Sequence, residues 1–475
     1  MIRAVNPSWL FVAVSTAFPV ILVAQQPAAK PPVLVEGARV LDVARGRYLA
    51  PSSVFIENGR IQSVTPEPPA SIPGGTVRVQ AAGSVLVPGL IDAHAWAAPA
   101  SGLEADYFYL MGLAHGVTGY RVLNARTSWG VAQRERSLSG AILSPRLWTS
   151  GRGINQGASP DRWLFDATDP SVAIGEVRRQ IDGNVNWVAG YDALTPDIYK
   201  AMVAAAKGTG VRISGQPGAS SMSDLVGAGA ASIETLAYPL KPRNGQAADA
   251  WLAAGAKELA ALQARLVRGR VALVPMMAAA MVRAFPEDVT QDPALALLPE
   301  ARRAELKATL EKLPAADVAK ARRAWTSQAA FLKRFVKARG RVAAGTGFEL
   351  GGYPVPGVGL HRELSALVRA GLPPVEAIRA ATSTAADLVG AKPTVARFAP
   401  GTDADFIIVS GDPLKTIEDL ANITHIIRAG EVFDPKVLLA RAQRTLAPRG
   451  LEAPGSISSW RLRLQTRHET RGHQP

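Results

Sequence analysis

Residues 88–99, PGLIDAHAWAAP, join a run of apolar residues to an acidic side chain and a histidine. The apolar run 85–91 is predicted to form a buried strand. Asp92 and His94 follow it and share one face of the chain, because successive side chains of a strand alternate between faces. Catalytic groups of α/β barrels lie at the carboxyl ends of their strands. This stretch therefore predicts both the first strand of a barrel and the place of its site.

Short apolar segments recur along the chain, separated by stretches with helical or loop patterns. They are residues 85–91, 116–123, 146–150, 185–190, 211–215, 232–236, 271–276 and 341–345. Strands that alternate with helices indicate parallel βαβ units, and eight such units are the number needed for a closed barrel. Helices are also predicted after the eighth segment, ending at Gly371 and at Gly390.

Strand patterns flank this region on both sides. Residues 33–41 and 53–64 are predicted strands, and Asn58-Gly59 is a strong hairpin signal. Strand patterns return in 404–413 and 423–433 and are predicted to complete the same small β domain. The predicted organisation is a signal peptide (1–24), a β-sandwich domain in two parts (31–86 and 398–435), a (β/α)₈ barrel (87–397) and a basic tail (436–475).

The first 24 residues have the pattern of a secretory signal: Arg3, an apolar run from Trp9 to Val23, and the small Ala24. We therefore expect export to the periplasm or the extracellular space, with no membrane association beyond this segment; an uncleaved anchor remains an alternative. The chain contains no cysteine, which excludes disulfides, thiolate metal sites and cysteine nucleophiles.

The formal net charge is +14, and residues 301–341 contribute twelve Lys/Arg against three Asp/Glu. Their spacing fits solvated helix faces, and no nucleic-acid-binding motif such as a zinc finger is found among them. We expect no specific nucleic-acid partner. A homo-oligomer is left open.

Several motifs together resemble the amidohydrolase superfamily, in its imidazolonepropionase-like and prolidase-like branch. They include PGLIDAH, GVTGYRVL, ASIETL, AAGTG, HRELSALVRAG and PGTDADFIIVSGDP, and the resemblance spans residues 33 to about 433. It implies a distorted TIM barrel with a composite β-sandwich domain. It also implies hydrolysis of C–N bonds, such as those of amides and dipeptides, with one or two divalent metals.

The residues at the family's six metal-binding places depart from that pattern. Aligning the motifs puts these places at His94, Trp96, Ala189, Gln216, Thr235 and Gly347. One histidine is kept, whereas a catalytic zinc site needs about three protein ligands and an open position for water. Without a metal, water keeps a pKa of about 15.7 instead of about 7. We therefore predict a degenerate metal site with no cofactor, and zinc only if other ligands have replaced the usual ones.

Neighbouring residues are weak candidates to replace the missing metal ligands. Glu234 precedes Thr235, so it is expected to point toward the helices if Thr235 points inward. A site made by His94, Glu349 and His361 would need distant residues to converge without a motif. His361 opens the helix after the eighth strand and is expected at the rim, with a substrate-binding and an architectural role both open.

Three hypotheses follow from these residues. The first is a metal-independent enzyme with His94 as acid or base, oriented by Asp92. The second is a binding protein whose pocket contains a small molecule, lined by Trp96, Tyr191, Gln216, Thr235, Tyr238 and His361. The third is an active metal-dependent amidohydrolase or dipeptidase with non-standard ligands. Whether the chain catalyses any reaction is left undecided by the sequence.

Overall fold

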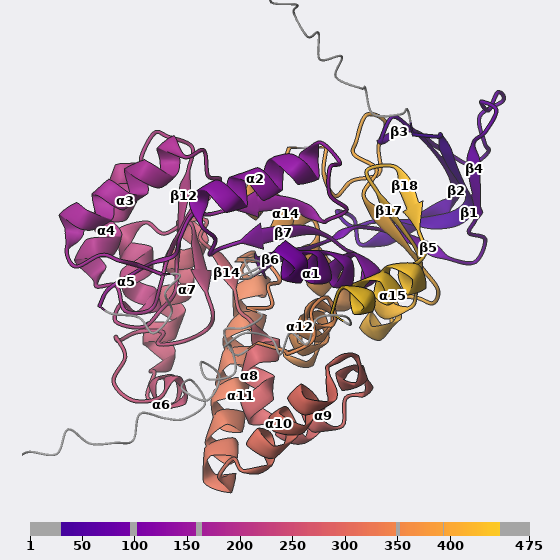
Figure 1. The fold of residues 1–475 in the computed structure, drawn as a ribbon. Helices are drawn as coiled ribbons and strands as arrows, with labels where there is room; N and C mark the ends of the chain where they lie inside the picture. The colour runs from indigo at the N-terminus through magenta and orange to yellow at the C-terminus, as the bar shows by residue number, and fades with distance from the viewer. Residues whose placement is uncertain (1–29, 96–101, 158–163, 348–351, 393, 447–475) are drawn as a thin grey trace, which may run out of the picture.

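The structure is a computed structural model, and it describes residues 30–95, 102–157, 164–347, 352–392 and 394–446. The predicted signal peptide, Trp96, Glu349 and the tail after residue 446 lie outside these ranges. The chain folds into a parallel barrel with helices around it and a second, mostly antiparallel sheet at one side (Figure 1). Among the described helices, none has the length and apolar character needed to cross a bilayer.

Eight strands form the barrel within the described residues. They are β6 (Leu90–Ala95), β7 (Val117–Val122), β8 (Arg146–Thr149), β11 (Trp187–Gly190), β12 (Arg212–Gly215), β13 (Ser232–Glu234), β14 (Ala272–Val274) and β15 (Arg341–Val342). Seven of them fall within predicted segments, and β6 overlaps the first predicted segment, 85–91, only at Leu90 and Ile91. The short β9 (Ile154–Asn155) and β10 (Phe165–Asp166) extend the sheet beside β11.

Backbone contacts at two seams close the barrel. Ser150 forms a parallel bridge with Trp187, which joins β8 to β11. At the other seam the Ala93 amide donates to the Ala344 carbonyl at 2.8 Å, and the Gly347 amide donates to the His94 carbonyl at 2.9 Å. The chain that follows β15 therefore lies directly against β6, the strand that carries His94.

The inside of the barrel is packed with side chains, as in other closed (β/α)₈ barrels. Small residues alternate with large ones, and the buried cluster there consists of Ile91, Ala93, Leu123, Trp148, Trp187, Ala189, Tyr191, Ala272, Val274 and Ala343, with residues from α14 and the loop after it. A larger cluster fills the layer between strands and helices. Strands covered on both faces explain why the segments are almost continuously apolar.

Helices follow most of the strands and cover the outside of the barrel. They are α1 (Gly102–Ala114), α2 (Thr127–Leu138), α3 (Pro170–Asp182), α4 (Pro196–Ala206), α5 (Met222–Ala228), α6 (Ala247–Leu252), α7 (Ala256–Arg268), α12 (Val358–Arg369), α13 (Pro374–Ala381) and α14 (Ser383–Val389). The last helix predicted from the sequence is in fact two, because the backbone bends at Thr382, which has φ −128° and ψ −97°.

A helical insertion separates β14 from β15 and projects from the barrel in Figure 1. It comprises α8 (Met277–Ala284), α9 (Pro286–Thr290), the 3₁₀ turn η1 (Pro293–Leu297), α10 (Glu300–Glu311) and α11 (Ala315–Lys337). The basic block 301–341 lies mainly on α10 and α11, where Arg323, Lys333, Arg334 and Lys337 are exposed. The predicted helical pattern of this block is confirmed.

The second sheet combines segments from both ends of the chain. Its strands are β1 (Val33–Asp42), β2 (Arg47–Glu57), β3 (Arg60–Thr65), β4 (Val77–Gln80), β5 (Val85–Pro88), β16 (Phe406–Val409), β17 (Ile423–Arg428) and β18 (Glu431–Phe433). The hairpin between β2 and β3 turns at Asn58 and Gly59, which both have positive φ as the sequence predicts. The 3₁₀ turn η2 (Ile417–Ala421) connects β16 to β17, and α15 (Pro435–Leu446) packs against α1.

The first predicted strand, 85–91, was wrong in one respect. Its first half, β5, pairs with β1 and β16 in the second sheet, and the barrel begins only at Leu90. Pro88 ends β5 because proline has no amide to continue the ladder. The Gly89 amide then donates to the Asp405 carbonyl at 3.0 Å, which fixes the passage from one sheet to the other.

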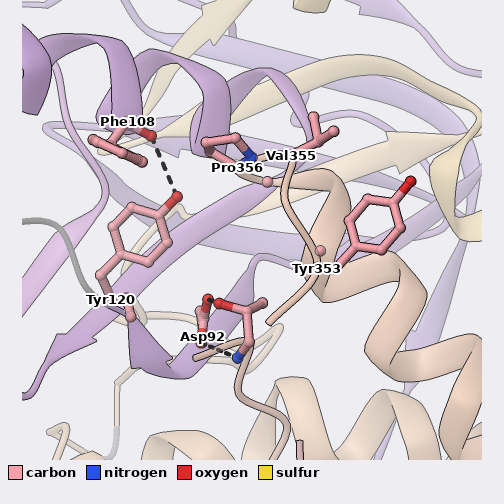
Figure 2. A pocket seen from close by; sticks show the side chains of 10 residues that line it. Asp92, Phe108, Tyr120, Tyr353, Val355 and Pro356 are labelled. Carbon is pink, nitrogen blue, oxygen red and sulfur yellow. Dashed lines mark hydrogen bonds between the residues drawn. The ribbon is translucent and has the colours of Figure 1, made fainter. Parts of the chain in front are cut away.

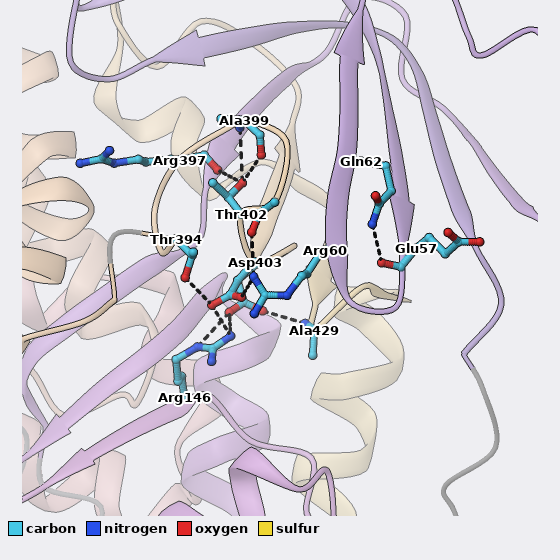
Figure 3. A network of polar contacts seen from close by, with 12 residues as sticks. Glu57, Arg60, Gln62, Arg146, Thr394, Arg397, Ala399, Thr402, Asp403 and Ala429 are labelled. Carbon is cyan, nitrogen blue, oxygen red and sulfur yellow. Dashed lines mark hydrogen bonds and ion pairs between the residues drawn. The ribbon is translucent and has the colours of Figure 1, made fainter.

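An ion-pair network connects this sheet to the barrel. Arg146 of β8 pairs with Asp405 at 2.7 Å and with Asp403 at 3.3 Å, and Arg428 of β17 pairs with Asp405 at 3.2 Å. Figure 3 shows Arg146 and Arg60 converging on Asp403 from the two domains. Burial raises the pKa of Asp405, but the two arginines outweigh it and the net pKa is lowered. The network therefore fixes the orientation of the barrel relative to the second sheet.

Candidate functional site

His94, Glu234 and Arg121 meet inside the barrel near the carboxyl ends of their strands. His94 Nδ1 lies 2.8 Å from Glu234 Oε2, and the Arg121 guanidinium donates to Glu234 Oε1, also at 2.8 Å. The Ser232 hydroxyl donates to the same Glu234 oxygen at 2.6 Å. All four side chains are buried. Strands β6, β7 and β13 thus contribute to one polar chain that crosses the interior.

Arg121 is held on several sides at once. Its Nε donates to the Ala93 carbonyl, and its Nη1 donates to the Ser232 hydroxyl at 3.0 Å. The guanidinium carbon also lies 4.6 Å from the centre of the Trp187 ring, a cation–π distance. Burial lowers the pKa of Arg121, and the negative charge of Glu234 only partly opposes this effect.

Glu234 is the acidic member of the chain. Burial raises the pKa of its carboxyl group, but the charge of Arg121 and the hydrogen bond to His94 outweigh burial, so the net pKa is lowered. Glu234 is therefore ionised at neutral pH and can only accept hydrogen bonds. It follows that His94 donates to Glu234 through Nδ1.

The expected orientation of Glu234 was wrong. It does not point toward the helices; its carboxylate lies inside the barrel with Ser232, while Ile233 between them packs into the outer core. The prediction took its alternation from Thr235, but β13 ends at Glu234 and Thr235 has φ 68°. The regular pleat does not continue through that residue, so side-chain parity cannot be counted back from it.

Asp92 was expected to orient His94, and the structure assigns it other partners. Its carboxylate accepts the amides of His94 and Thr346, both at 3.0 Å, and the Thr346 hydroxyl at 2.6 Å. It therefore fixes the backbone of β6 against the chain after β15, while Glu234 binds the imidazole. Burial raises the pKa of Asp92, and these hydrogen bonds oppose the rise without cancelling it.

A small cavity adjoins Asp92. Figure 2 shows Asp92, Tyr120 and Tyr353 around it, and its volume of about 20 Å³ is enough for about one water molecule. The Tyr120 hydroxyl donates to the Phe108 carbonyl at 3.3 Å, so it does not bind Asp92 directly. This cavity lies between the strands and α12 and is too small for a substrate.

The remaining places of the family's ligands can be followed strand by strand. Ala189 of β11 lies in the inner cluster, and Gly347 has φ 55° and approaches His94 through its backbone. The Gln216 amide donates to the Gly190 carbonyl at 3.0 Å, and the Thr235 amide donates to the Val274 carbonyl at 2.8 Å. These backbone contacts arrange the ends of β11 to β14 in order around the mouth.

Three of the residues predicted to bind a small molecule, Tyr191, Tyr238 and His361, lie in different surroundings. Tyr191 lies at the end of β11 in the inner cluster, together with Ala189. Tyr238 follows β13, but its hydroxyl donates to the Gly245 carbonyl at 3.0 Å within its own loop. His361 lies away from the mouth: its Nε2 is 2.8 Å from the carbonyl of His115, which precedes the start of β7. Its position is that of an architectural contact between α12 and the end of α1.

Trp96 and Glu349 lie outside the described residues. Arg121 was not singled out at all, although an arginine inside the wholly buried strand VTGYRV was a signal that could have been used. A buried arginine needs a carboxylate partner, and strand alternation would have led to a search for one among the inward residues.

At the places that the sequence predicted for the family's metal ligands, the described side chains offer few donors. Ala189 and Gly347 have no side-chain donor, and Gln216 and Thr235 are neutral. His94 has one ring nitrogen, Nδ1, bound to Glu234, so only its other ring nitrogen could face a metal. Across the described ranges, no three His, Cys, Asp or Glu residues lie together in a way that could bind a metal ion.

These strands and this fold define a class of protein. Residues 85–433 match the Amidohydrolase family, so the chain belongs to that family. Solved structures support the fold: a putative prolidase from Bifidobacterium longum superposes with a TM-score of 0.68 at 21% identity, covering 87% of this chain and 100% of that one. The ochratoxinase of Aspergillus niger superposes with a TM-score of 0.63 at 19% identity, covering 85% and 96%.

Sequence relatives match shorter stretches. Adenine deaminase 3 of Rhizobium johnstonii is 29% identical over 168 residues, which are 31% of this chain and 27% of that protein. The ochratoxinase of Aspergillus niger is 33% identical over 115 residues, 23% of this chain and 24% of that protein. The matched stretches thus cover only about a quarter of these curated relatives.

Proposed function

We propose that this chain is a member of the amidohydrolase family that works without a divalent metal and binds a small molecule with a C–N bond at the carboxyl mouth of its barrel. The observation behind this proposal is the set of residues at the family's ligand places. Four of them, Ala189, Gln216, Thr235 and Gly347, supply no usual zinc ligand. The histidine that is kept, His94, would be a single ligand, whereas a catalytic zinc site needs about three.

The chemistry of the mouth favours a neutral ligand. Tyr191 contributes aromatic surface, and Gln216 and Thr235 contribute uncharged hydrogen-bonding groups near the strand ends. Sites of this kind bind small molecules by apolar contact and a few placed polar groups. An amide, a cyclic amide or a dipeptide would fit this surface. Compounds of this kind are also suggested by the similar structures, which include a prolidase and an ochratoxinase.

The test combines metal analysis with thermal shift on the full chain. After expression with added zinc, manganese and iron, we expect no stoichiometric metal and no change in Tm on chelation. A ligand at 100 times its Kd stabilises the folded state by about 2.7 kcal/mol, so a screen of small amides and dipeptides should reveal one that raises Tm. His94→Ala should abolish that shift, while His425→Ala, in the second sheet, should keep it.

A metal-dependent amidohydrolase with non-standard ligands is the second candidate. The bond between His94 Nδ1 and Glu234 favours it, because metal-binding histidines commonly donate their other ring nitrogen to a carboxylate. Zinc or another divalent metal would then be required. Stoichiometric metal in the purified protein, with hydrolysis of an amide or dipeptide that a chelator stops, would establish this candidate and refute the first.

We also propose that the chain is exported, on the pattern of residues 1–24. Mass spectrometry of the protein recovered from cell fractions would give its mature N-terminus. A start near Gln25 in the exported fraction supports the proposal. An intact N-terminus found in the cytoplasm alone would contradict it.

A further inference from the structure

We propose that residues 235–246, which connect β13 to α6, form a movable strap over the carboxyl ends of β11 to β13, and that the ion pair between Arg243 and Asp192 holds this strap closed. The inference rests on the function proposed above and adds to it the step by which a small amide enters. The closed strap covers this part of the mouth, and breaking the ion pair lets it move aside.

The strap is attached to the loops that follow two neighbouring strands. The Arg243 amide donates to the Gly218 carbonyl at 2.7 Å, in the loop after β12. The Arg243 side chain reaches farther and pairs with Asp192, in the loop after β11. These two loops also bind each other, because the Ala219 amide donates to the Asp192 carbonyl at 2.7 Å. Arg243 thus joins the strap to both loops at one point.

The two halves of the strap are held differently. The first half lies against the start of α5: the Met222 amide donates to the Tyr238 carbonyl at 3.0 Å, and the Ser223 amide donates to the Pro239 carbonyl at 3.2 Å. In the second half, every residue from 241 to 245 is exposed. Arg243 lies in the middle of this exposed half and attaches it to the other loops.

The backbone of the strap is strained at its beginning. Thr235 and Tyr238 have φ of 68° and 46°, in the left-handed region that residues with a Cβ adopt only at a cost in energy. Such conformations persist where surrounding contacts hold them. Near the other end, Gly245 has φ 89°, which a glycine adopts without that cost. Loss of the contacts of Arg243 would therefore allow the strap to relax into another conformation.

The ion pair is of a kind that can open. The side chains of Arg243 and Asp192 are 47% and 34% exposed. Water and salt weaken a pair that is exposed to this degree, and such pairs contribute little to stability. The Arg243 guanidinium also lies 5.6 Å from the centre of the Tyr238 ring, near the outer limit of a cation–π contact. These contacts favour the closed strap without fixing it permanently.

The closed strap explains why two of the predicted binding residues are covered. Tyr191 and Tyr238 are 6% and 8% exposed, which leaves too little of either ring for a ligand to contact. Tyr191 directly precedes Asp192, and Tyr238 belongs to the strap itself. Opening of the strap would uncover both rings at the ends of their strands. Ligand-binding elements that open locally are drawn from the less stable parts of a fold.

Hydrogen–deuterium exchange of the full chain, followed by mass spectrometry, tests the ion pair without a ligand. The amides of Met222, Ser223 and Arg243 report opening, because each takes part in a hydrogen bond between the strap and its neighbours. Asp192→Asn should raise the exchange rates of all three together by about two- to fivefold, the effect of losing a partly exposed ion pair. Sodium chloride at about 1 M should raise them in the wild type and not in Asp192→Asn.

Asp197→Asn is the matched control. It removes a carboxylate from another exposed ion pair, which Asp197 forms with Lys200 on α4 at 3.2 Å, and should leave the three exchange rates unchanged. Arg243→Met should act like Asp192→Asn, and combining the two should add nothing, because both break the same contact. Faster exchange throughout the barrel would indicate a general loss of stability and would overturn the proposal.

A thiol below the strap tests whether opening admits a small amide. The chain contains no cysteine, so Ser214→Cys provides a single thiol. Ser214 lies on β12 beside Ala189 in the sheet and is 1% exposed. Iodoacetamide, which is itself a small neutral amide, should alkylate this thiol faster when Asp192→Asn is added, by the same factor as the exchange rates.

The outcomes separate the two proposals. Exchange rates that Asp192→Asn leaves unchanged overturn the role of the ion pair. Faster exchange with unchanged alkylation overturns the role of the strap as a cover. If exchange and alkylation both become faster while the thermal-shift screen finds no amide or dipeptide that binds, the strap stands and the proposed function fails.

Discussion

Replacing Arg121 with methionine isolates the electrostatic role of this residue. The change removes the positive charge beside Glu234 and keeps most of the side-chain volume. It eliminates the 2.8 Å contact with Glu234 and the 3.0 Å hydrogen bond to Ser232, and leaves a carboxylate that is 1% exposed. Breaking a buried ion pair in this way costs about 3–5 kcal/mol, because one charge stays buried without a partner.

The double variant tests that account. Adding Glu234→Gln to Arg121→Met removes the buried negative charge that has lost its partner. The double variant should therefore be more stable than Arg121→Met. The assay is thermal unfolding of the full chain at neutral pH, followed by circular dichroism. We expect the highest Tm for the wild type, a lower Tm for the double variant and the lowest Tm for Arg121→Met. A double variant with a Tm at or below that of Arg121→Met would refute the reasoning.

The pH dependence gives an independent check of sign. The pKa of Glu234 is lowered from its ordinary value of 4.5, so its ion pair contributes stability above that pH and the contribution is lost as pH falls through the lowered pKa. In Arg121→Met, burial acts on Glu234 without the opposing charge, and protonation relieves the cost. The Tm deficit of the variant should therefore shrink as the pH is lowered. A deficit that grows toward acid pH would contradict the assignment.

Three other perturbations have definite expectations. Burial raises the pKa of Glu363 to about 8, so the wild type loses stability as pH rises from 4.5 to about 8, and the Tm advantage of Glu363→Gln should grow over that window and then level off. Asp405→Asn should cost about 3–5 kcal/mol, measured as a lower Tm, and Asp403→Asn less, because the Asp403 side chain is 14% exposed against 4% for Asp405. Gly345→Ala would place a Cβ 2.8 Å from that of His94 and should destabilise the barrel by about 1–3 kcal/mol, seen in thermal unfolding.

The sequence predicted the barrel well because its signal is repeated. Eight apolar segments each bury two faces, and an error in one segment leaves the count and order intact. The misassignment at 85–91 shows the limit of this approach: β5 and β6 are equally apolar, and only Pro88 and the partner strands separate them. The hydrophobicity of a segment indicates that it is buried, but it does not indicate which sheet the segment joins.

The site was harder to predict because it depends on where a strand stops. One residue with positive φ, Thr235, reversed the expected direction of Glu234. Arg121 and Glu234 lie 113 positions apart in the chain, so no local pattern joins them. The contact could have been inferred only by asking what neutralises an arginine in a buried strand.

The contacts that close the barrel also fix the position of His94. The amide of Gly347 and the carboxylate of Asp92 tie the chain after β15 to the backbone of β6, on either side of the residue whose ring Glu234 holds. The backbone of His94 is thus held by the chain after β15, and its ring is held by Glu234 of β13. Because packed interiors transmit small displacements, a change at the seam should alter the His94 ring contact as well as stability. For Gly345→Ala this means a shifted NMR signal of the His94 ring along with the lower Tm, and a lower Tm with an unchanged signal would show that the two are independent.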